Sequence, residues 1–395
     1  MVLHQSWETY ITDRLHLAHE KNQHRSMKVF DSFQPGYLIR NGKQILNLCS
    51  NDYLGLASDA EGKEEAKLLA DILPYGGGAS RLVTGNLAIH HELEKSLAAW
   101  KGTEGAVIFP SGYQTNVGLL SSLAAKGDAI FCDRLNHASL LDGCRLSGAT
   151  LHRYRHNDLD DLETLLKTKR PRKRIIVTDG VFSMDGDIAP LREIYQLAKG
   201  YGAILIVDEA HATGVLGEKG AGSWSHFGLP LDDNIILMGT LSKAVGGQGG
   251  YVCASKKMVD YLTNYCRALI YSTSLSPLLA GLAHYNIHRI QDQPELIDSL
   301  NQACQTFKQA LTENQVPFED SSTPILPIIL GSSQKAIQCS ERLMEQDIAA
   351  AAIRPPTVPE GTSRLRVSVS ASHSANDLTR AAKAVAETLQ EPKEE

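Results

Sequence analysis

The chain has 395 residues, of which 43% are hydrophobic and 21% charged, and its formal net charge is −6 at pH 7. This composition is ordinary for a globular protein and allows large cores. The acidic balance argues against a nucleic-acid or membrane partner, because Lys and Arg are spread along the chain and the densest basic run, residues 167–174, is typical of a solvated face. No apolar run approaches the ~20 residues that cross a bilayer.

The seven cysteines favour a cytoplasmic protein. Their number is odd and no CxxC pair occurs, which suits packed, reduced thiols better than a disulfide framework. The N-terminus lacks a basic segment followed by an apolar core, so we expect no signal peptide.

Residues 1–60 contain one helical pattern and a few extended stretches, and we expect an arm that packs on the rest of the chain. Residues 61–285 alternate between amphipathic helices and short strands that are apolar on both faces. This pattern predicts an α/β domain with a mostly parallel central sheet and helices on both faces. The expected strands are 105–112, 129–133, 174–180, 203–211, 234–240 and 250–255, and the clearest helices are 91–100 and 188–202.

The pattern changes after residue 285. A long amphipathic helix over 295–315 precedes shorter strand-like and helical segments. Ser374 and Asp377 have the spacing of a capping box for the last helix. We therefore expect residues 286–395 to form a smaller α+β domain.

Lys243 stands in the string TLSKAVGGQGG, just after the expected strand 234–240 and before a run of glycines. A phosphate-loop lysine would follow its glycines, as in GxxxxGK[ST], so that role is excluded. The string VDEAH at 207–211 resembles part of a helicase motif, but without a phosphate loop a nucleic-acid translocase is a poor alternative. An exposed loop charge and a nucleophilic amine remain.

Asp208 closes the strand pattern that precedes the strand of Lys243. Neighbouring parallel strands end at the same edge of a sheet, so the two side chains are expected to meet there. A lysine in apolar surroundings can act as an amine nucleophile, and a buried carboxylate needs a cation beside it. Pyridoxal phosphate, carried by Lys243 as a Schiff base with its ring nitrogen protonated by Asp208, satisfies both residues. The alternative for Asp208 is a cap on the next turn.

The phosphate of such a cofactor needs hydrogen-bond donors. The backbone of Gly112 and Tyr113, where SGYQTN opens a helix, and the hydroxyl of Thr240 suit a dianion, although an ordinary β–α turn is the simpler explanation of SGY alone. His137 is placed to stack on a pyridine ring, and Ser183 lies just past a strand end.

Arg354 precedes two prolines, which favour extended backbone. An arginine held in this way suits a bidentate contact with a substrate carboxylate, and a surface salt bridge is the alternative. His284 and His288 share one helix face, and HHE at 90–92 does not complete HExxH, so we expect no metal site.

Eight strings, in order along nearly the whole chain, resemble the α-oxoamine synthase family of fold-type I pyridoxal phosphate enzymes. They are GGGASRLVTGN, SGYQTN, LNHASLLDG, TDGVFSMDGDIAPL, DEAHATGVLG, GTLSKAVGGQGG, IYSTSLSP and AIRPPTVPEGTSRLR. The fold that this resemblance implies is the α/β fold expected above, with a smaller C-terminal α+β domain.

The resemblance also implies a role for each matching residue. Lys243 carries the cofactor, Asp208 pairs with its ring nitrogen and His137 stacks on its ring. The other implied cofactor contacts are His211 and Ser183 near the ring oxygen, and Gly112, Tyr113 and Thr240 at the phosphate. Ser272 and Thr273 match positions that reach the phosphate in the site of a partner subunit, which implies a homodimer with shared sites. The implied substrate-side residues are Arg25, Asn51, Arg354 and Thr357, together with His137, which is expected to polarise the thioester carbonyl as well as to stack on the ring.

Three strings, SRLVTGN, DGCRLSGA and YRHND, favour the family member that condenses L-alanine with pimeloyl-CoA, or with a pimeloyl carrier protein, in biotin biosynthesis. The resemblance then implies that Lys243 removes the Cα proton of alanine, that the carbanion attacks the thioester, and that CO2 is lost. The alternative within the family is 2-amino-3-ketobutyrate CoA ligase, which uses glycine and acetyl-CoA. A pyridoxal phosphate protein without catalytic activity is the alternative outside it.

Overall fold

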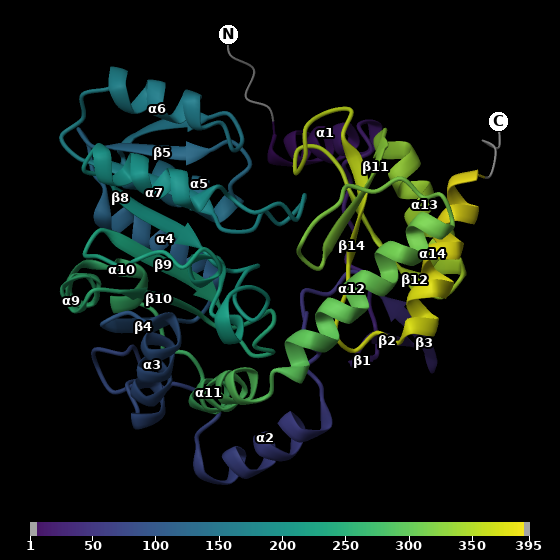
Figure 1. Cartoon of the computed structure of the whole chain (residues 1–395), viewed down its shortest axis with the longest axis horizontal. Coiled ribbons are helices and arrows are strands. Elements are labelled where there is room, and N and C mark those ends of the chain that lie inside the picture. The colour runs from purple at the N-terminus through teal and green to yellow at the C-terminus, as the bar shows by residue number, and fades with distance from the viewer. Residues whose placement is uncertain (1–5, 391–395) are drawn as a thin grey trace.

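The computed structural model describes residues 6–390. Within that range its largest sheet has seven strands in the order β4-β10-β9-β8-β7-β5-β6 (Figure 1). They are β4 (Gly105–Phe109), β5 (Ala129–Asp133), β6 (Thr150–Tyr154), β7 (Arg174–Asp179), β8 (Ile204–Asp208), β9 (Ile235–Thr240) and β10 (Gly250–Ala254). β10 is antiparallel to both neighbours, whereas β9, β8, β7, β5 and β6 pair in parallel. The expected mostly parallel sheet is confirmed.

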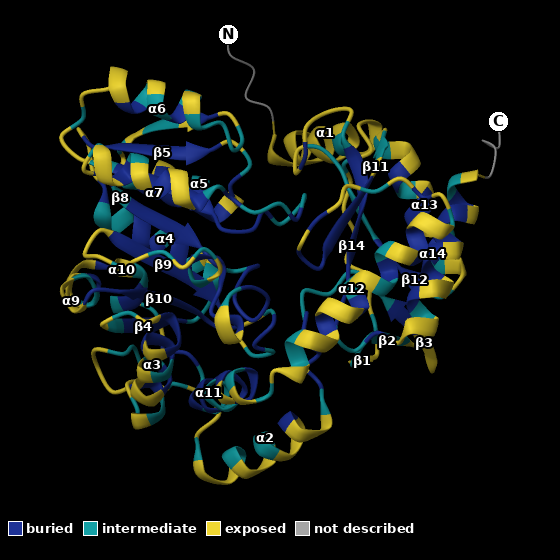
Figure 2. Cartoon of the chain, viewed as in Figure 1, coloured by how far each residue is buried: buried dark blue, intermediate teal, exposed yellow. Residues whose placement is uncertain are grey.

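Helices bury both faces of this sheet, and most of each strand has the dark blue of buried residues in Figure 2. Side chains alternate between the faces of a strand: in β8, Leu205 and Val207 belong to one core and Ile206 to the other. The first core includes residues of α3 (Ala88–Lys101), α6 (Leu159–Thr168), α7 (Leu191–Gly200) and α11 (Pro277–Asp292). The second includes residues of α4 (Gly112–Leu123), α5 (Ala138–Ser147), α9 (Lys256–Tyr265) and α10 (Arg267–Ile270). This arrangement explains why the predicted strands are apolar on both sides.

A second group of elements joins the two ends of the chain. β1 (Ser32–Gln34), β2 (Tyr37–Arg40) and β3 (Lys43–Asn47) form a sheet with β12 (Ile348–Ala349). β11 (Ile325–Gly331), β14 (Ser363–Ser368) and β13 (Ala351–Ile353) form another, and α12 (Glu295–Glu313), α13 (Ser333–Glu345) and α14 (Ala375–Gln390) contribute to the same core. The N-terminal arm therefore packs with C-terminal elements, while domain boundaries at residues 60 and 285 stay a prediction.

The remaining helices connect these parts. α1 (Trp7–Glu20) contributes no buried residue, α2 (Ala60–Ile72) follows the N-terminal sheet, and α8 (Ser223–His226) lies between β8 and β9 after a 3₁₀ turn (Glu218–Gly220). No helix within residues 6–390 is both long and apolar enough to cross a membrane.

Some local expectations were wrong or incomplete. β6 was not predicted, because its sequence TLHRY is polar and it lies at the sheet edge. α7 begins at Leu191 rather than at residue 188, since Pro190 takes the capping position and Ile188 bridges to Val181. The expected capping pair of α14 does form: Ser374 accepts from the Asp377 N–H at 3.1 Å, and the Asp377 carboxylate accepts from the hydroxyl and backbone of Ser374 and, at 2.6 Å, from the Tyr37 hydroxyl.

Candidate active site

A cavity of about 230 Å³ lies at the carboxyl ends of the parallel strands. β8 and β9 are adjacent and parallel, so Asp208 and Lys243 come to the same edge of the sheet, as expected. The predicted residues Gly112, Tyr113, His137, Asp208, His211, Thr240 and Lys243 all line this cavity. The other lining residues are Ser111, Asn116, Ser139, Asp179, Val181, Ala210, Met238 and Ser242.

Lys243 follows the end of β9, and its side chain is half-buried. Its Nζ lies 2.7 Å from Nε2 of His211. Burial lowers the pKa of Lys243 to about 8, although the nearby Asp208 carboxylate acts in the opposite direction. A sizeable fraction of the amine is therefore neutral near pH 7.5, which a nucleophile or a base requires.

The glycines after Lys243 have a packing reason. Gly246 has a φ of +71°, and a Cβ on it would lie 2.6 Å from the carbonyl carbon of Leu56. The N–H of Gly246 also donates to the Lys243 carbonyl at 2.9 Å, which closes a turn. Only glycine fits this turn without displacing the neighbouring segment.

Asp208 is buried at the end of β8. Its Oδ1 accepts from the N–H of Ala210 at 2.9 Å, and its Oδ2 accepts from the amide of Asn116 at 2.8 Å. Asp208 thus caps the next turn and also presents a carboxylate to the cavity. Asn116, one turn into α4, was missed because the sequence gives no sign that this helix turn faces Asp208.

The N-terminus of α4 forms another wall. Ser111 caps it by accepting from the N–H of Gln114 at 3.3 Å, and the first N–H groups of a helix have no partner within the helix. A Cβ on Gly112 would lie 3.2 Å from the Cβ of Thr240, so the helix start and the end of β9 pack closely. This wall suits a phosphate dianion.

His211 and His137 differ in their surroundings. His211 is buried, which holds its pKa well below the usual range, and its Nδ1 lies 2.7 Å from the Tyr53 hydroxyl. When Lys243 donates to Nε2, the ring proton is on Nδ1. His137 caps α5 and contacts the Ser139 hydroxyl at 2.7 Å through Nδ1, while its ring borders the cavity.

Asp179 is a further buried acid that the sequence analysis missed. It pairs in register with Asp208 across β7 and β8. Burial, and then the charge of Asp208, raise the pKa of Asp179 well above its usual range. The sequence does indicate this residue, because Asp179 stands at the end of one strand pattern, in TDG, as Asp208 stands at the end of the next, in VDE.

Comparison with known proteins gives a consistent picture. A family model of class I and II aminotransferases matches residues 43–385. A Bacillus cereus protein provisionally named 8-amino-7-oxononanoate synthase is 47% identical over 380 residues, which cover 95% of each chain. A Geobacillus kaustophilus protein with the same provisional name is 45% identical over 380 residues, covering 96% of this chain and 97% of the relative.

Solved structures agree. A Sphingomonas wittichii serine palmitoyltransferase is 30% identical and covers 98% of both chains with a TM-score of 0.90. The 8-amino-7-oxononanoate synthase of Francisella tularensis is 28% identical and covers 88% of this chain and 98% of its own, with a TM-score of 0.76. The chain belongs to the α-oxoamine synthase family of fold-type I pyridoxal phosphate enzymes.

The cavity of this α-oxoamine synthase family member fits pyridoxal phosphate. The amine of Lys243, the buried carboxylate of Asp208 and the start of α4 line it together, and an amine, an acid and backbone N–H donors are the groups that this cofactor requires. Among the described residues, Oδ1 of Asn116 is buried without a hydrogen-bond partner, which leaves an unused acceptor at the cavity wall.

Two of the predicted residues, Asn51 and Ser183, lie outside the cavity. Both contact Arg366, an arginine that was not predicted from the sequence. Arg366 in β14 is only 4% exposed, and its guanidinium donates to the Ser183 carbonyl and, at 3.0 Å, to Oδ1 of Asn51. It also lies 3.4 Å from the Tyr53 hydroxyl, which contacts His211. Arginines at alternate positions of an otherwise apolar strand, RLRVSV, were the available signal.

The other residues predicted to contact the substrate, Arg25, Arg354 and Thr357, do not line the first cavity. Arg25 and Arg354 line a second cavity of about 630 Å³, and Arg354 donates to the Asn22 carbonyl at 2.6 Å. Thr357 is exposed beyond Arg354. Their roles in the α-oxoamine synthase reaction stay predictions.

Ser272 and Thr273 do not line the cavity. The Ser272 hydroxyl accepts from the Gln114 amide at 3.4 Å, and Thr273 bridges to Ser80. This position is compatible with a contact to another subunit.

Proposed function

We propose that the protein is an 8-amino-7-oxononanoate synthase. It condenses L-alanine with a pimeloyl thioester, either pimeloyl-CoA or pimeloyl carrier protein, and releases CO2 and the free thiol carrier in biotin biosynthesis. The observation that carries the chemistry is the meeting of Lys243 and Asp208 in one cavity at the ends of β8 and β9. The relatives that are 45–47% identical support the choice of substrates.

Pyridoxal phosphate supplies an electron sink for the carbanion that forms at Cα of the bound amino acid. Asp208, oriented by Asn116 and by the N–H of Ala210, holds a proton at the ring nitrogen. The N-terminus of α4 at Gly112 and Tyr113, with the Thr240 hydroxyl, binds the phosphate. His137, which lines the cavity, would lie against one face of the ring.

Lys243 has two tasks. With the cofactor present, the amine of Lys243 would hold it, and the same Nζ, when free, would accept the Cα proton of alanine. The lowered pKa of Lys243, about 8, keeps enough of the amine neutral for this step near pH 7.5. His211, which its burial keeps neutral, accepts from Nζ at 2.7 Å and orients it.

The alanine carboxylate needs a cation. Arg366 is the buried guanidinium beside Ser183, Asn51 and the Tyr53–His211 pair. It can form charge-assisted hydrogen bonds to a carboxylate at that place. Arg354 and Thr357 are proposed for the same substrate on the side of the second cavity, together with Arg25.

A homodimer with shared sites completes the proposal. The tyrosines Tyr75 and Tyr271 are both more than 70% exposed. Their segments lie side by side, since the N–H of Ser274 donates to the Ala79 carbonyl and the hydroxyl of Ser276 donates to the Tyr75 carbonyl. Exposed apolar side chains next to Thr273 suit contact with a second copy of the chain. The free cysteines suit a cytoplasmic location.

The function is tested with alanine and glycine against pimeloyl-CoA, pimeloyl carrier protein and acetyl-CoA, following thiol release and CO2. The proposal predicts the fastest turnover with alanine and a pimeloyl thioester. Preference for glycine and acetyl-CoA would select the 2-amino-3-ketobutyrate CoA ligase activity. Both activities would be contradicted if no donor released its thiol, or if thiol release did not depend on the amino acid.

A further inference from the structure

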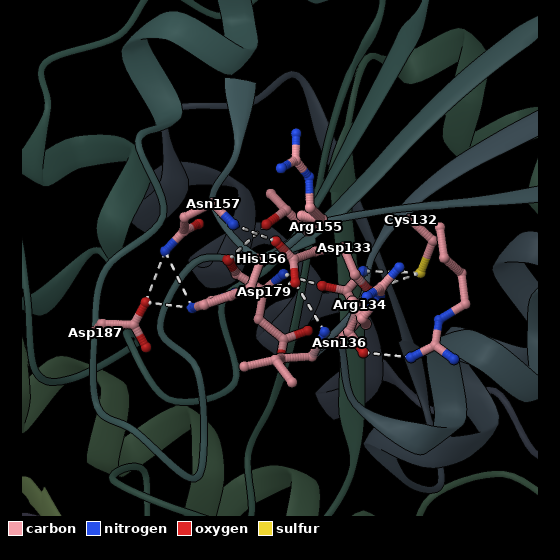
Figure 3. A network of polar contacts seen from close by, with 12 residues as sticks. Cys132, Asp133, Arg134, Asn136, Arg155, His156, Asn157, Asp179 and Asp187 are labelled. Carbon is pink, nitrogen blue, oxygen red and sulfur yellow. Dashed lines mark hydrogen bonds and ion pairs between the residues drawn. The ribbon is translucent and has the colours of Figure 1, made fainter. Parts of the chain in front are cut away.

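A polar network outside the cavity contains a histidine between two carboxylates (Figure 3). His156 follows β6; its Nδ1 lies 3.0 Å from Oδ1 of Asp133, and its Nε2 lies 2.9 Å from Oδ2 of Asp187. A neutral imidazole has a single N–H, so both contacts are satisfied only by the protonated ring. His156 is therefore a cation that joins Asp133 to Asp187.

The surroundings of His156 maintain this charge. Burial works against it, but the hydrogen bonds to Asp133 and Asp187 outweigh burial and raise the pKa of His156 to about 10. Asn157 holds the same two acids, because its N–H donates to Asp133 at 2.9 Å and its amide donates to Asp187 at 2.7 Å. The ring also packs edge-on against Phe182, with 4.4 Å between ring centroids.

The Asp133 side of the network leads to His137. Asp133 is fully buried at the end of β5, and its Oδ1 also accepts from the N–H of Leu135 at 2.8 Å. Asn136, the next residue, donates to the Val177 carbonyl at 2.9 Å, and the N–H of His137 lies 3.4 Å from Oδ1 of Asp179. Asp133 thus fixes the turn that carries His137.

The Asp187 side leads to Ser183. The N–H of Phe182 donates to the Asp187 carbonyl at 3.0 Å, and the N–H of Gly186 donates back to Phe182 at 2.8 Å. Residues 182–187 therefore form a closed turn, and the Ser183 carbonyl of that turn accepts from Arg366. Movement of Asp187 would displace Ser183, whose carbonyl is a partner of Arg366.

We propose that His156 is a positioning residue of the active site, whose two ion pairs hold the turn of His137 in register with the turn of Ser183. His137 lines the cavity, and Ser183, which lies outside the lining residues, is the residue that the sequence predicts near the ring oxygen of pyridoxal phosphate, so the inference rests on the proposed cofactor site. His156 itself lies outside the residues that line the cavity. Its effect on the cofactor is transmitted through Asp133 and Asp187.

The test compares His156→Gln with the wild type by three measurements: the dissociation constant for pyridoxal phosphate, the visible circular dichroism of the bound cofactor, and the thermal midpoint. Misplacement of ring contacts should raise the dissociation constant by about tenfold to a hundredfold and change the visible band. The matched control is His152→Gln. His152 is also partly exposed and lies in β6, but its ring stacks on Phe131, so its substitution should leave both cofactor measurements within about twofold.

A second variant covers the case in which His156→Gln does not fold, because it leaves the buried Asp133 without its cation. Asp187→Asn keeps the pair of His156 and Asp133 and removes only the charge of the ion pair to the turn of Ser183. It should weaken cofactor binding by at least about threefold, less than His156→Gln does. A folded His156→Gln or Asp187→Asn protein with wild-type affinity and an unchanged visible band would overturn the inference, even if its thermal midpoint fell.

These measurements need no substrate, which separates the inference from the proposed reaction. A wild type that binds pyridoxal phosphate but does not condense alanine with a pimeloyl thioester would refute the proposed reaction. The role of His156 would still be tested by comparing cofactor binding in the variants. A wild type that binds no pyridoxal phosphate would overturn both.

Discussion

Replacing Lys243 by methionine should stabilise the cofactor-free protein at neutral pH. Below pH 8 the folded protein holds a protonated amine whose pKa has fallen from 10.5 to about 8 because of burial. At about 1.4 kcal/mol for each tenfold change, that cost is about 3 kcal/mol at pH 7, an upper figure because Lys243 is partly exposed. Methionine also leaves Nε2 of His211 without its partner, which costs about 1 kcal/mol. The net expected gain is about 2 kcal/mol.

The sign of the pH dependence follows from the lowered pKa. Between pH 8 and 10.5 the unfolded chain keeps a proton on Lys243 that the folded protein has lost, so wild-type stability rises relative to Lys243→Met as the pH rises. The advantage of the variant is complete below pH 8, shrinks by about 1.4 kcal/mol per pH unit above it, and disappears at about pH 9.5 to 10, where the remaining cost of the protonated amine equals that of the lost contact with His211. Above that pH the wild type should be the more stable protein, because it keeps the contact with His211.

Urea unfolding of the cofactor-free proteins between pH 7 and 10, at one protein concentration, measures this difference, because all other ionisable groups are common to both proteins. The control is Lys126→Met at an exposed position, which should change the free energy of unfolding by less than about 0.5 kcal/mol at every pH. Parallel stability curves for the wild type and Lys243→Met, or a less stable variant at pH 7, would refute the account of a desolvated amine with a lowered pKa.

Three further predictions concern the reaction. Asp208→Asn should slow the exchange of the alanine Cα proton with deuterated solvent, followed by NMR, by roughly a hundredfold; exchange near the wild-type rate would remove Asp208 from its electron-sink role. Arg366→Gln should raise the KM for alanine by at least about tenfold and by more than Arg354→Gln does, and unchanged KM values in both variants would exclude both arginines from carboxylate binding. Mixing Lys243→Ala with Thr273→Glu subunits, each inactive alone, should restore about a quarter of the activity if sites are shared, whereas no recovery in proven mixed dimers would assign each site to one chain.

The sheet and the centre of the site were predictable because their signals are local. The strands that are apolar on both faces are short and regular, and they specify a sheet whose carboxyl ends meet at one edge. Asp208 ends one such strand and Lys243 closely follows the end of its neighbour, so strand order brings them together. β6 was not predicted from the sequence, because a strand at the edge of a sheet needs fewer apolar residues.

The outer parts of the site depend on contacts between distant segments. Arg366 binds Asn51, which lies 315 residues earlier in the chain, and no pattern in either segment indicates that partner. Asn116 and Asp179 look like ordinary helix and strand-end residues until their burial beside Asp208 is seen. Arg354 was chosen for its rigid neighbours, yet rigidity does not specify direction, and its guanidinium lies against the Asn22 carbonyl.

The central claim, that Lys243 carries pyridoxal phosphate opposite Asp208, is tested most directly by borohydride reduction of the cofactor-loaded protein followed by peptide mapping. Borohydride fixes the cofactor covalently to the lysine that holds it. The account predicts that the label appears on the peptide containing Lys243 and on no other. Label on a different lysine, or a loaded protein that cannot be labelled, would contradict it.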